Sequence, residues 1–211
     1  MFKHLSVFAL ALVLFASCDN TNTTETTDGD AEVAIQPAVP AAAQTSEMRG
    51  ENYVVKVVDA TIKSPRKELS GEVEGVPLRI NYGSPAVNER TIYGDLVPYK
   101  KVWRTGANEA TRITFDRDVM VGEANKRLAA GTYALFTLPD SKDEWTVIFN
   151  KVSDQWGAYD YEEADDVARI RGMAKAAPQR AERMDFMLEG NNVALTWDDL
   201  VVTFPIASAS K

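Results

Sequence analysis

The sequence is organised around one polar and aromatic segment, Tyr99-Lys100-Lys101-Val102-Trp103-Arg104-Thr105-Gly106-Ala107-Asn108-Glu109-Ala110. The chain before and after it has the pattern of β-strands, so the segment is expected to belong to a loop between strands. A tryptophan beside a few placed polar groups is typical of a ligand pocket. The same residues would also suit a capped turn, in which Arg104 pairs with Glu109 to satisfy a buried charge. We place the structural interpretation first and keep both open.

Outward from this segment, apolar residues alternate with polar ones in short runs. Val76, Leu78, Ile80 and Tyr82 predict a half-buried strand, and residues 133–138, apolar on both faces, predict a central strand. The remaining strands are expected within residues 53–58, 66–73, 111–115, 119–121, 126–128, 145–149, 167–174, 184–188, 193–197 and 200–206.

Turn residues separate these strands. Gly122 predicts a hairpin, Asp198-Asp199 predicts the last turn of the chain, and residues 162–166 predict a short helical turn. Short strands at a spacing of about ten residues, with few helical turns, predict an all-β fold. We expect an antiparallel β-sandwich or jelly-roll-like single domain over residues 51–211, with about nine or ten strands.

The amino terminus has the pattern of an export signal. Lys3 precedes an apolar run at residues 5–15, and small residues stand just before Cys18. This predicts a signal peptide over residues 1–17, too short to span a bilayer as a mature helix. The residues around Cys18 resemble the bacterial lipoprotein box, with Phe15 in place of the more usual aliphatic residue. That resemblance implies cleavage before Cys18 and lipidation of its sulfur; an ordinary signal peptide with a chance cysteine is the alternative.

Residues 18–50 are rich in threonine, alanine, proline and acids and have no hydrophobic period. Such a segment cannot offset its ordering entropy, so we expect a disordered tether with a reach of roughly 30 Å. The domain is therefore expected to be exported and anchored through Cys18 to the bacterial cell envelope. We expect the outer membrane, with the domain in the periplasm or at the cell surface.

Composition excludes several kinds of chemistry. The only histidine is His4, inside the predicted signal peptide, and the only cysteine is Cys18. A mature chain without imidazole or free thiol excludes Ser-His-Asp and Cys-His catalysis and zinc sites that need those ligands. We expect no metal and no cofactor. Removal of Lys3 lowers the net charge from −8 to −9, which disfavours nucleic acid as a partner.

Two loops supply the candidate site residues. Trp103 can be core or a stacking platform, and Asn108 can close its own turn or bind a ligand. Trp156, with Tyr159 and Tyr161, can form an aromatic shelf for a sugar ring or a satellite cluster of the core. We expect the two loops to meet at one end of the sandwich. The candidate ligand-binding residues are Tyr99, Trp103, Arg104, Asn108, Glu109 and Trp156.

Two classes of function remain open. The first is a non-catalytic binding or interaction module for a glycan, a peptidoglycan fragment or a partner protein. The second is a glycan-active enzyme that uses carboxylates, with two acids about 5–5.5 Å or 6.5–9.5 Å apart. Its catalytic residue would be Glu109, with Asp95, Asp154 or Asp160 as the second acid. No spacing singles out such a pair, so binding ranks first.

Several motifs resemble one known family. They are Ser64-Pro65-Arg66, Ile80-Asn81-Tyr82-Gly83-Ser84-Pro85, Val97-Pro98-Tyr99, Val102-Trp103-Arg104-Thr105-Gly106-Ala107-Asn108-Glu109-Ala110-Thr111, Ala130-Gly131-Thr132-Tyr133, Trp145-Thr146-Val147-Ile148 and Gln155-Trp156-Gly157. Together they resemble the bacterial family called domain of unknown function 2911, over residues 64–206. The resemblance implies a secreted or lipid-anchored protein of a Bacteroidetes-type envelope. It implies no activity.

Overall fold

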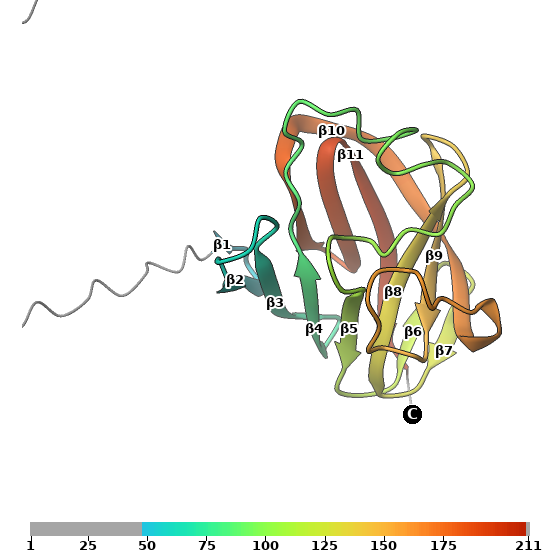
Figure 1. The fold of residues 1–211 in the computed structure, drawn as a ribbon. Helices are drawn as coiled ribbons and strands as arrows, with labels where there is room; N and C mark the ends of the chain where they lie inside the picture. The colour runs from blue at the N-terminus through green and yellow to red at the C-terminus, as the bar shows by residue number, and fades with distance from the viewer. Residues whose placement is uncertain (1–47, 210–211) are drawn as a thin grey trace, which may run out of the picture. The chain divides into compact units, whose positions relative to one another are not determined.

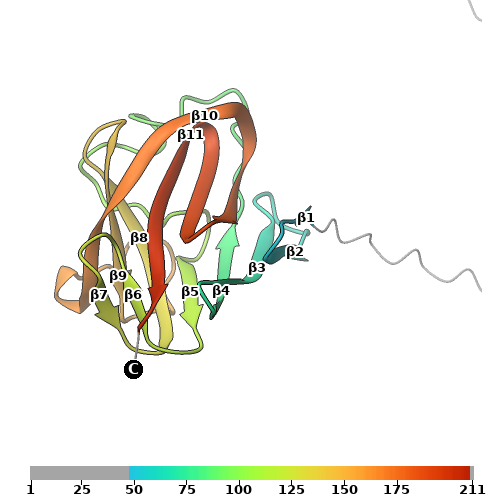
Figure 2. The same ribbon diagram turned by 180° about the vertical axis from the view of Figure 1, so that it is seen from behind.

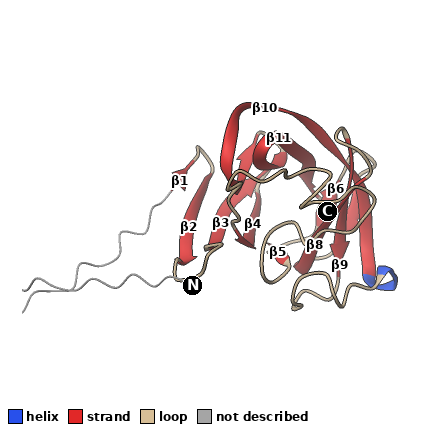
Figure 3. Ribbon diagram, turned by 45° about the horizontal axis from the view of Figure 1, so that its top comes forward, coloured by secondary structure: helices blue, strands red, loops and turns tan. Residues whose placement is uncertain are grey.

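The alternating segments form a single antiparallel β-sheet in the computed structural model, which describes residues 48–209 (Figure 1). The strands are β1 (Met48–Arg49), β2 (Tyr53–Asp59), β3 (Arg66–Val73), β4 (Val76–Gly83), β5 (Thr111–Phe115), β6 (Val119–Val121), β7 (Lys126–Leu128), β8 (Gly131–Pro139), β9 (Glu144–Asn150), β10 (Asp166–Glu189) and β11 (Asn192–Ser208). One turn of 3-10 helix, Glu163–Asp165, precedes β10 (Figure 3). The helical turn expected at residues 162–166 is confirmed.

The strand order is β1-β2-β3-β4-β5-β8-β9-β10-β11-β6-β7, in one sheet of 11 strands. The all-β antiparallel prediction is confirmed, whereas the division into two sheets of a sandwich or jelly roll is not. The described part holds 11 strands rather than nine or ten. No helix within residues 48–209 is long and apolar enough to cross a membrane. The signal peptide, Cys18 and most of the tether lie outside the described residues.

Strand β8 is central, as its sequence predicts, because it pairs with β5 on one side and β9 on the other. One face of β8 contributes Leu135 to the main core. The other face contributes Ala134 and Phe136 to a smaller cluster, which Val102 and Tyr161 cover from the loops. Both faces are apolar because both are covered, and the loops that cover the second face are those of the candidate site.

The two longest strands differ from their prediction. Residues 167–174 and 184–188 are parts of one strand, β10, and the turn expected at Asp198-Asp199 lies inside β11. The β10–β11 pairing shifts register at Ala176, Ala181 and Asp185, and Asp198 has a φ of 49°. Extra residues of this kind bend a strand and raise its twist without ending it. Both strands arch over the sheet at this bend (Figures 1 and 2).

The bend of β10 also receives the chain that leaves β4. The amide of Val87 donates to the carbonyl of Glu182 at 2.7 Å, and the amide of Met184 donates to the carbonyl of Pro85 at 3.0 Å. These bonds join the early strands to the late ones and enclose the aromatic core. The largest fully buried side chains of that core are Trp145, Trp197, Tyr82, Phe115, Phe149 and Phe186.

Candidate functional site

The loop between β4 and β5, residues 84–110, positions the central segment of the sequence. Figure 1 shows it climbing from β4 to the bend of β10 and returning to β5. On the return, Trp103 and Thr137 of β8 exchange backbone hydrogen bonds of 2.7 and 2.9 Å. At the base of the loop, Gly83 lies so close to Ala107 that a Cβ on Gly83 would be 2.2 Å from the Ala107 carbonyl oxygen, and only glycine allows this contact. The segment is therefore pinned to β8 and to the end of β4.

Five non-glycine residues of this loop lie in the left-handed region of φ, namely Asn88, Glu89, Lys100, Thr105 and Asn108, and the last two flank Gly106 beside Arg104. Thr105 has a φ of 54° and Asn108 a φ of 63°. Asparagine tolerates this conformation, but for a β-branched threonine it costs on the order of 1–3 kcal/mol. Two hydrogen bonds offset part of this strain energy. Oγ1 of Thr111 donates to the Thr105 carbonyl at 2.8 Å, and Oγ1 of Thr105 donates to Oγ1 of Thr137 at 3.2 Å. Strained backbone conformations that the surrounding structure maintains are often found at functional sites, so this loop is a candidate for a functional site.

Beside the loop lies a cavity of about 280 Å³. It is formed by the β2–β3 connection, both ends of the β4–β5 loop and one residue of β11. The lining residues are Lys63, Ser64, Pro85, Ala86, Asn88, Arg90, Leu96, Trp103, Arg104, Gly106, Ala107, Asn108 and Trp197. Three of the sequence candidates, Trp103, Arg104 and Asn108, are therefore brought together in one cavity.

Trp103 belongs to the core, which confirms that interpretation. Its side chain is 8% exposed. Its ring stacks on Trp197 at a centroid distance of 5.8 Å and an interplanar angle of 16°, and it meets Trp145 edge-on at 6.5 Å. Because Trp103 and Trp197 also line the cavity, the aromatic core forms part of its wall.

The predicted pair of Arg104 and Glu109 is wrong. Glu109 instead accepts a hydrogen bond of 2.9 Å from Nη1 of Arg66, which also donates from Nε to Asn81. Arg66 pairs with Gly83 across the β3–β4 ladder, and Gly83 contacts the loop at Ala107. The pairing at this end of the β3–β4 ladder therefore places Arg66 next to Glu109, although the two residues are far apart in the sequence.

Arg104 is left without a counter-charge in the described part of the chain. Its side chain is half-buried, and its Nε is buried without a hydrogen-bond acceptor. Burial lowers the pKa of the Arg104 guanidinium, and the nearby Tyr159 acts weakly in the opposite direction. A desolvated cation of this kind is stabilised by an anion or by ligand oxygens.

The cavity carries three cationic side chains and no carboxylate among its lining residues. Arg90 donates to the carbonyls of Val87 and Ala86 at 3.0 and 2.5 Å, which fixes its position. Within residues 48–209, the other polar side chains of the lining make no hydrogen bond or ion pair, although the backbone amide of Asn88 donates to the Glu182 carboxylate at 2.9 Å. These side chains are those of Lys63, Ser64, Asn88, Arg104 and Asn108.

The second candidate loop meets the first, as expected. Glu109 and Trp156 form a β-bridge, and the amide of Ala110 donates to the carbonyl of Gln155 at 3.0 Å. Trp156 is 58% exposed and Tyr159 is 83% exposed. Tyr161 instead packs edge-on against Phe136 at 5.1 Å, in the smaller core cluster. The satellite interpretation therefore holds for Tyr161, whereas an aromatic shelf at Trp156 and Tyr159 stays a prediction.

The remaining candidates lie apart from this cavity. Tyr99 lines a neighbouring cavity of about 390 Å³, which shares only Arg90 with the first. Neither Asp95, Asp154 nor Asp160 lines the Arg104 cavity, and Asp154 lies 3.6 Å from Arg112. Within the described residues, no three side chains of the histidine, cysteine, aspartate and glutamate types gather as they would around a metal ion.

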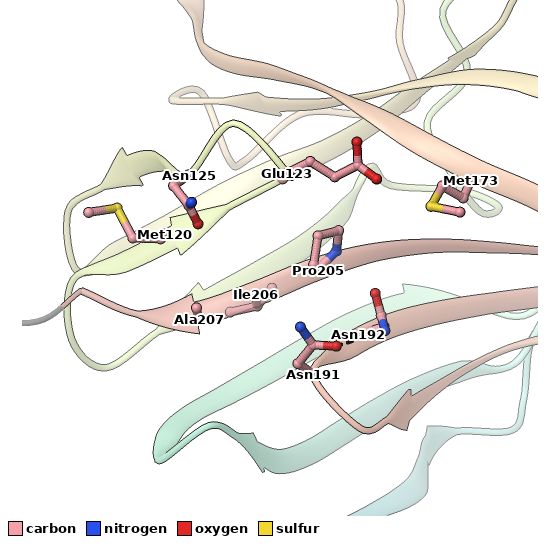
Figure 4. Close-up of a pocket in the computed structure, with 10 residues that line it drawn as sticks. Met120, Glu123, Asn125, Met173, Asn191, Asn192, Pro205, Ile206 and Ala207 are labelled. Atoms are coloured by element: carbon pink, nitrogen blue, oxygen red, sulfur yellow. Dashed lines mark hydrogen bonds between the residues drawn. The ribbon is translucent and has the colours of Figure 1, made fainter.

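A separate hollow of about 430 Å³ lies at the β6–β7 hairpin (Figure 4). It is lined by Met120, Glu123 and Asn125 of that hairpin, by Asn191 and Asn192 of the β10–β11 turn, and by the end of β11. It contains no cationic side chain and none of the sequence candidates. We therefore treat the Arg104 cavity as the candidate site.

Sequence reasoning missed four polar or aromatic lining residues, Lys63, Asn88, Arg90 and Trp197, as well as the apolar Ala86 and Leu96. Lys63 directly precedes the Ser64-Pro65-Arg66 motif, and Asn88 follows the Ser84-Pro85 motif by a few residues. For Lys63 and Asn88, the only indication in the sequence was their position close to a family motif. Trp197 had none, because its alternating neighbours predict an ordinary core strand.

The fold and the site define an all-β domain with a preformed cationic cavity beside a tryptophan-rich core. The chain belongs to the family described as protein of unknown function DUF2911, whose model matches residues 64–206. The matched range contains every lining residue of the cavity except Lys63. The chain matches none of the curated proteins and none of the solved structures with which it was compared.

Proposed function

We propose that this protein is a non-catalytic binding module of the bacterial cell envelope, and that the Arg104 cavity binds a glycan or a peptidoglycan fragment. The observation that carries the proposal is the set of unengaged polar groups around a tryptophan wall. Ligand sites combine an apolar wall with a small number of placed polar groups in this way.

The rigidity of the loop supports binding. Thr105 and Gly83 hold the Arg104–Asn108 segment through backbone and side-chain contacts that need no ligand. A preformed site loses less conformational entropy on binding than a mobile one does. Sugar hydroxyls would find donors at Arg104 and Asn108 and an acceptor at Ser64, while the buried indoles of Trp103 and Trp197 close the apolar side of the cavity.

The carboxylate-dependent enzyme receives no comparable support. A glycan hydrolase needs one acid and one base beside the bound sugar. Among residues 48–209, no carboxylate lines the Arg104 cavity, and Glu109 is engaged by Arg66. Binding therefore accounts for the site without an acid–base pair.

The envelope location is part of the same proposal. Its support is the sequence pattern at residues 1–18 and the family resemblance. A diacylglyceryl group on Cys18 would hold the chain at a membrane, since each buried methylene contributes about 0.8 kcal/mol. The tether would then present the domain to envelope glycans.

Titration of the full chain with soluble peptidoglycan fragments and with a panel of neutral and acidic glycans tests the proposal. Asn108→Gly removes the amide while keeping a residue that tolerates the left-handed φ of 63°. We expect about a tenfold loss of affinity, which is the value of roughly one hydrogen bond.

The matched control is Asn125→Gly, in the separate hollow, where φ is 49° and no side-chain bond is made within residues 48–209. It should leave the affinity unchanged. Equal losses in both variants, or no binding of any carbohydrate, would reject the proposal.

A further inference from the structure

The cavity differs in charge from the rest of the protein. The whole chain carries 23 lysines and arginines against 31 aspartates and glutamates. The cavity is lined by Lys63, Arg90 and Arg104 and by no carboxylate. A concentration of one charge in a concave site raises the local concentration of ligands of the opposite charge.

Arg104 differs from the other shielded arginines of residues 48–209. Four arginines there are buried or half-buried, namely Arg66, Arg104, Arg112 and Arg169. Arg66 pairs with Glu109, Arg112 with Asp154 and Arg169 with Asp166. Arg104 alone among these four has no carboxylate partner, so the cost of shielding its charge is not offset within the described residues.

Before any ligand arrives, Arg90 is held through its guanidinium and Arg104 through its backbone. Arg90 uses Nε and Nη2 for backbone carbonyls and leaves Nη1 free of protein partners within residues 48–209. The Arg104 backbone is fixed because its carbonyl accepts from the Thr111 amide at 3.2 Å. A guanidinium fork matches the two oxygens of a carboxylate, and a site fixed in advance gains specificity from this match.

We infer that the ligand of this cavity is an anion, and that Arg104, assisted by Arg90 and Lys63, binds a carboxylate of an acidic saccharide or peptidoglycan fragment. The inference rests on the proposed function and names the chemical class of its ligand. The amides of Asn88 and Asn108 are available for the hydroxyl or peptide groups next to that carboxylate.

The test is calorimetric titration of the full chain with two pairs of probes. The first pair is trigalacturonic acid and its methyl ester, and the second is a disaccharide-peptide fragment of peptidoglycan and its fully amidated form. We expect the acid of one pair to bind at least tenfold more tightly than its neutral partner, and added salt to weaken it. The pair that shows this difference identifies the source of the carboxylate.

Arg104→Gln is expected to reduce binding of the acidic probe at least tenfold and to weaken binding of the neutral probe much less, because the glutamine amide still donates to hydroxyls but carries no charge. Arg171→Gln is the control, because it removes the same charge from an exposed arginine outside this cavity. If Arg104→Gln does not fold, Lys63→Gln replaces it, since Lys63 is exposed and makes no side-chain bond within the described part. A smaller loss in the same direction is expected there.

The outcomes separate the inference from the proposed function. Equal binding of acidic and neutral probes would overturn the inference and leave carbohydrate binding intact. Equal losses in Arg104→Gln and Arg171→Gln would also overturn it, because the attraction would then belong to the whole surface. No binding of any of the four probes would overturn both.

Discussion

Glu109 and Arg66 form a contact between positions 43 apart in the chain, with 2.9 Å between Oε2 and Nη1. The sequence places Arg104 much closer to Glu109, which is why that pair was expected. The folded chain instead pairs Glu109 with Arg66. Gly83, which has no Cβ, packs closely against Ala107, and Arg66 lies opposite Gly83 in the β3–β4 ladder, so Arg66 comes beside Glu109. The structure thus replaces the expected Arg104–Glu109 pair with an Arg66–Glu109 ion pair, and within residues 48–209 it leaves Arg104 without a carboxylate partner.

Glu109→Gln is expected to lower the free energy of unfolding by about 1–2 kcal/mol. Arg66 is 8% exposed and would lose its charged acceptor, while the 41% exposure of the Glu109 side chain limits the loss through solvent screening. Urea denaturation at neutral pH measures the change.

Asp154→Asn is the control for this substitution, because the side chain of Asp154 is 95% exposed and lies 3.6 Å from Arg112. Its effect should stay within about 0.5 kcal/mol. Equal changes in the free energy of unfolding in the two variants would show that the Arg66–Glu109 pair stabilises the protein no more than an exposed ion pair does.

Among the structural elements, the β4–β5 loop depends on two glycines, Gly83 at the end of β4 and Gly106 within the loop. A Cβ on Gly83 would lie 2.2 Å from the Ala107 oxygen, and a Cβ on Gly106 would lie 3.0 Å from the Gly83 oxygen. Two backbones approach here as closely as glycine permits. The loop therefore keeps its position by contact with the end of β4 and by its bonds to β8, and the cavity depends on both.

Gly83→Ala is expected to destabilise the protein by about 1–3 kcal/mol, because its methyl group meets backbone that cannot rotate away. The variant should also lose carbohydrate affinity, since the loop that carries Arg104 must shift. Thermal unfolding and the titration described above measure the two effects.

Gly75→Asn serves as the comparison for Gly83→Ala. Gly75 has a φ of 73° with open space around it, and asparagine accepts that conformation. We expect a change of less than about 1 kcal/mol and unchanged affinity. A Gly83→Ala protein as stable as Gly75→Asn would show that the loop is not held by this contact.

For the whole molecule, we propose an order of parts: export signal, lipidated cysteine, tether and β-domain. The first three lie almost wholly outside the described residues and stay predictions. The order matters for the proposed function, because a tether of roughly 30 Å would let the cavity search glycans near a membrane while the lipid holds the chain.

Cys18→Ala is expected to move the protein from the membrane fraction to the soluble fraction and to abolish incorporation of labelled fatty acid. The physical reason is the loss of the acyl chains that would hold it. His4→Ala, within the segment expected to be removed, should change neither readout. Membrane association that survives Cys18→Ala would contradict the anchor.

Most strands could be predicted from the sequence because alternation is a local property. Residues 76–82 and 133–138 specify which faces are covered, whichever strands lie beside them. The prediction failed at Asp198-Asp199, where a turn-forming pair sits in a bend of β11. Pairing with β10 continues on both sides of that bend, and turn residues alone cannot distinguish a bend from a hairpin.

The sequence by itself determined the all-β class and the family and singled out the Trp103–Asn108 segment as a candidate, since each depends on residues close together in the chain. Only the tertiary structure decided that Glu109 turns to Arg66, and that Lys63, Arg90 and Trp197 join Arg104 around one cavity. Those contacts arise from the close approach of Gly83 to Ala107 and from the arch of β10 and β11. Such long-range closure has no local signature, because it depends on how distant backbone segments pack.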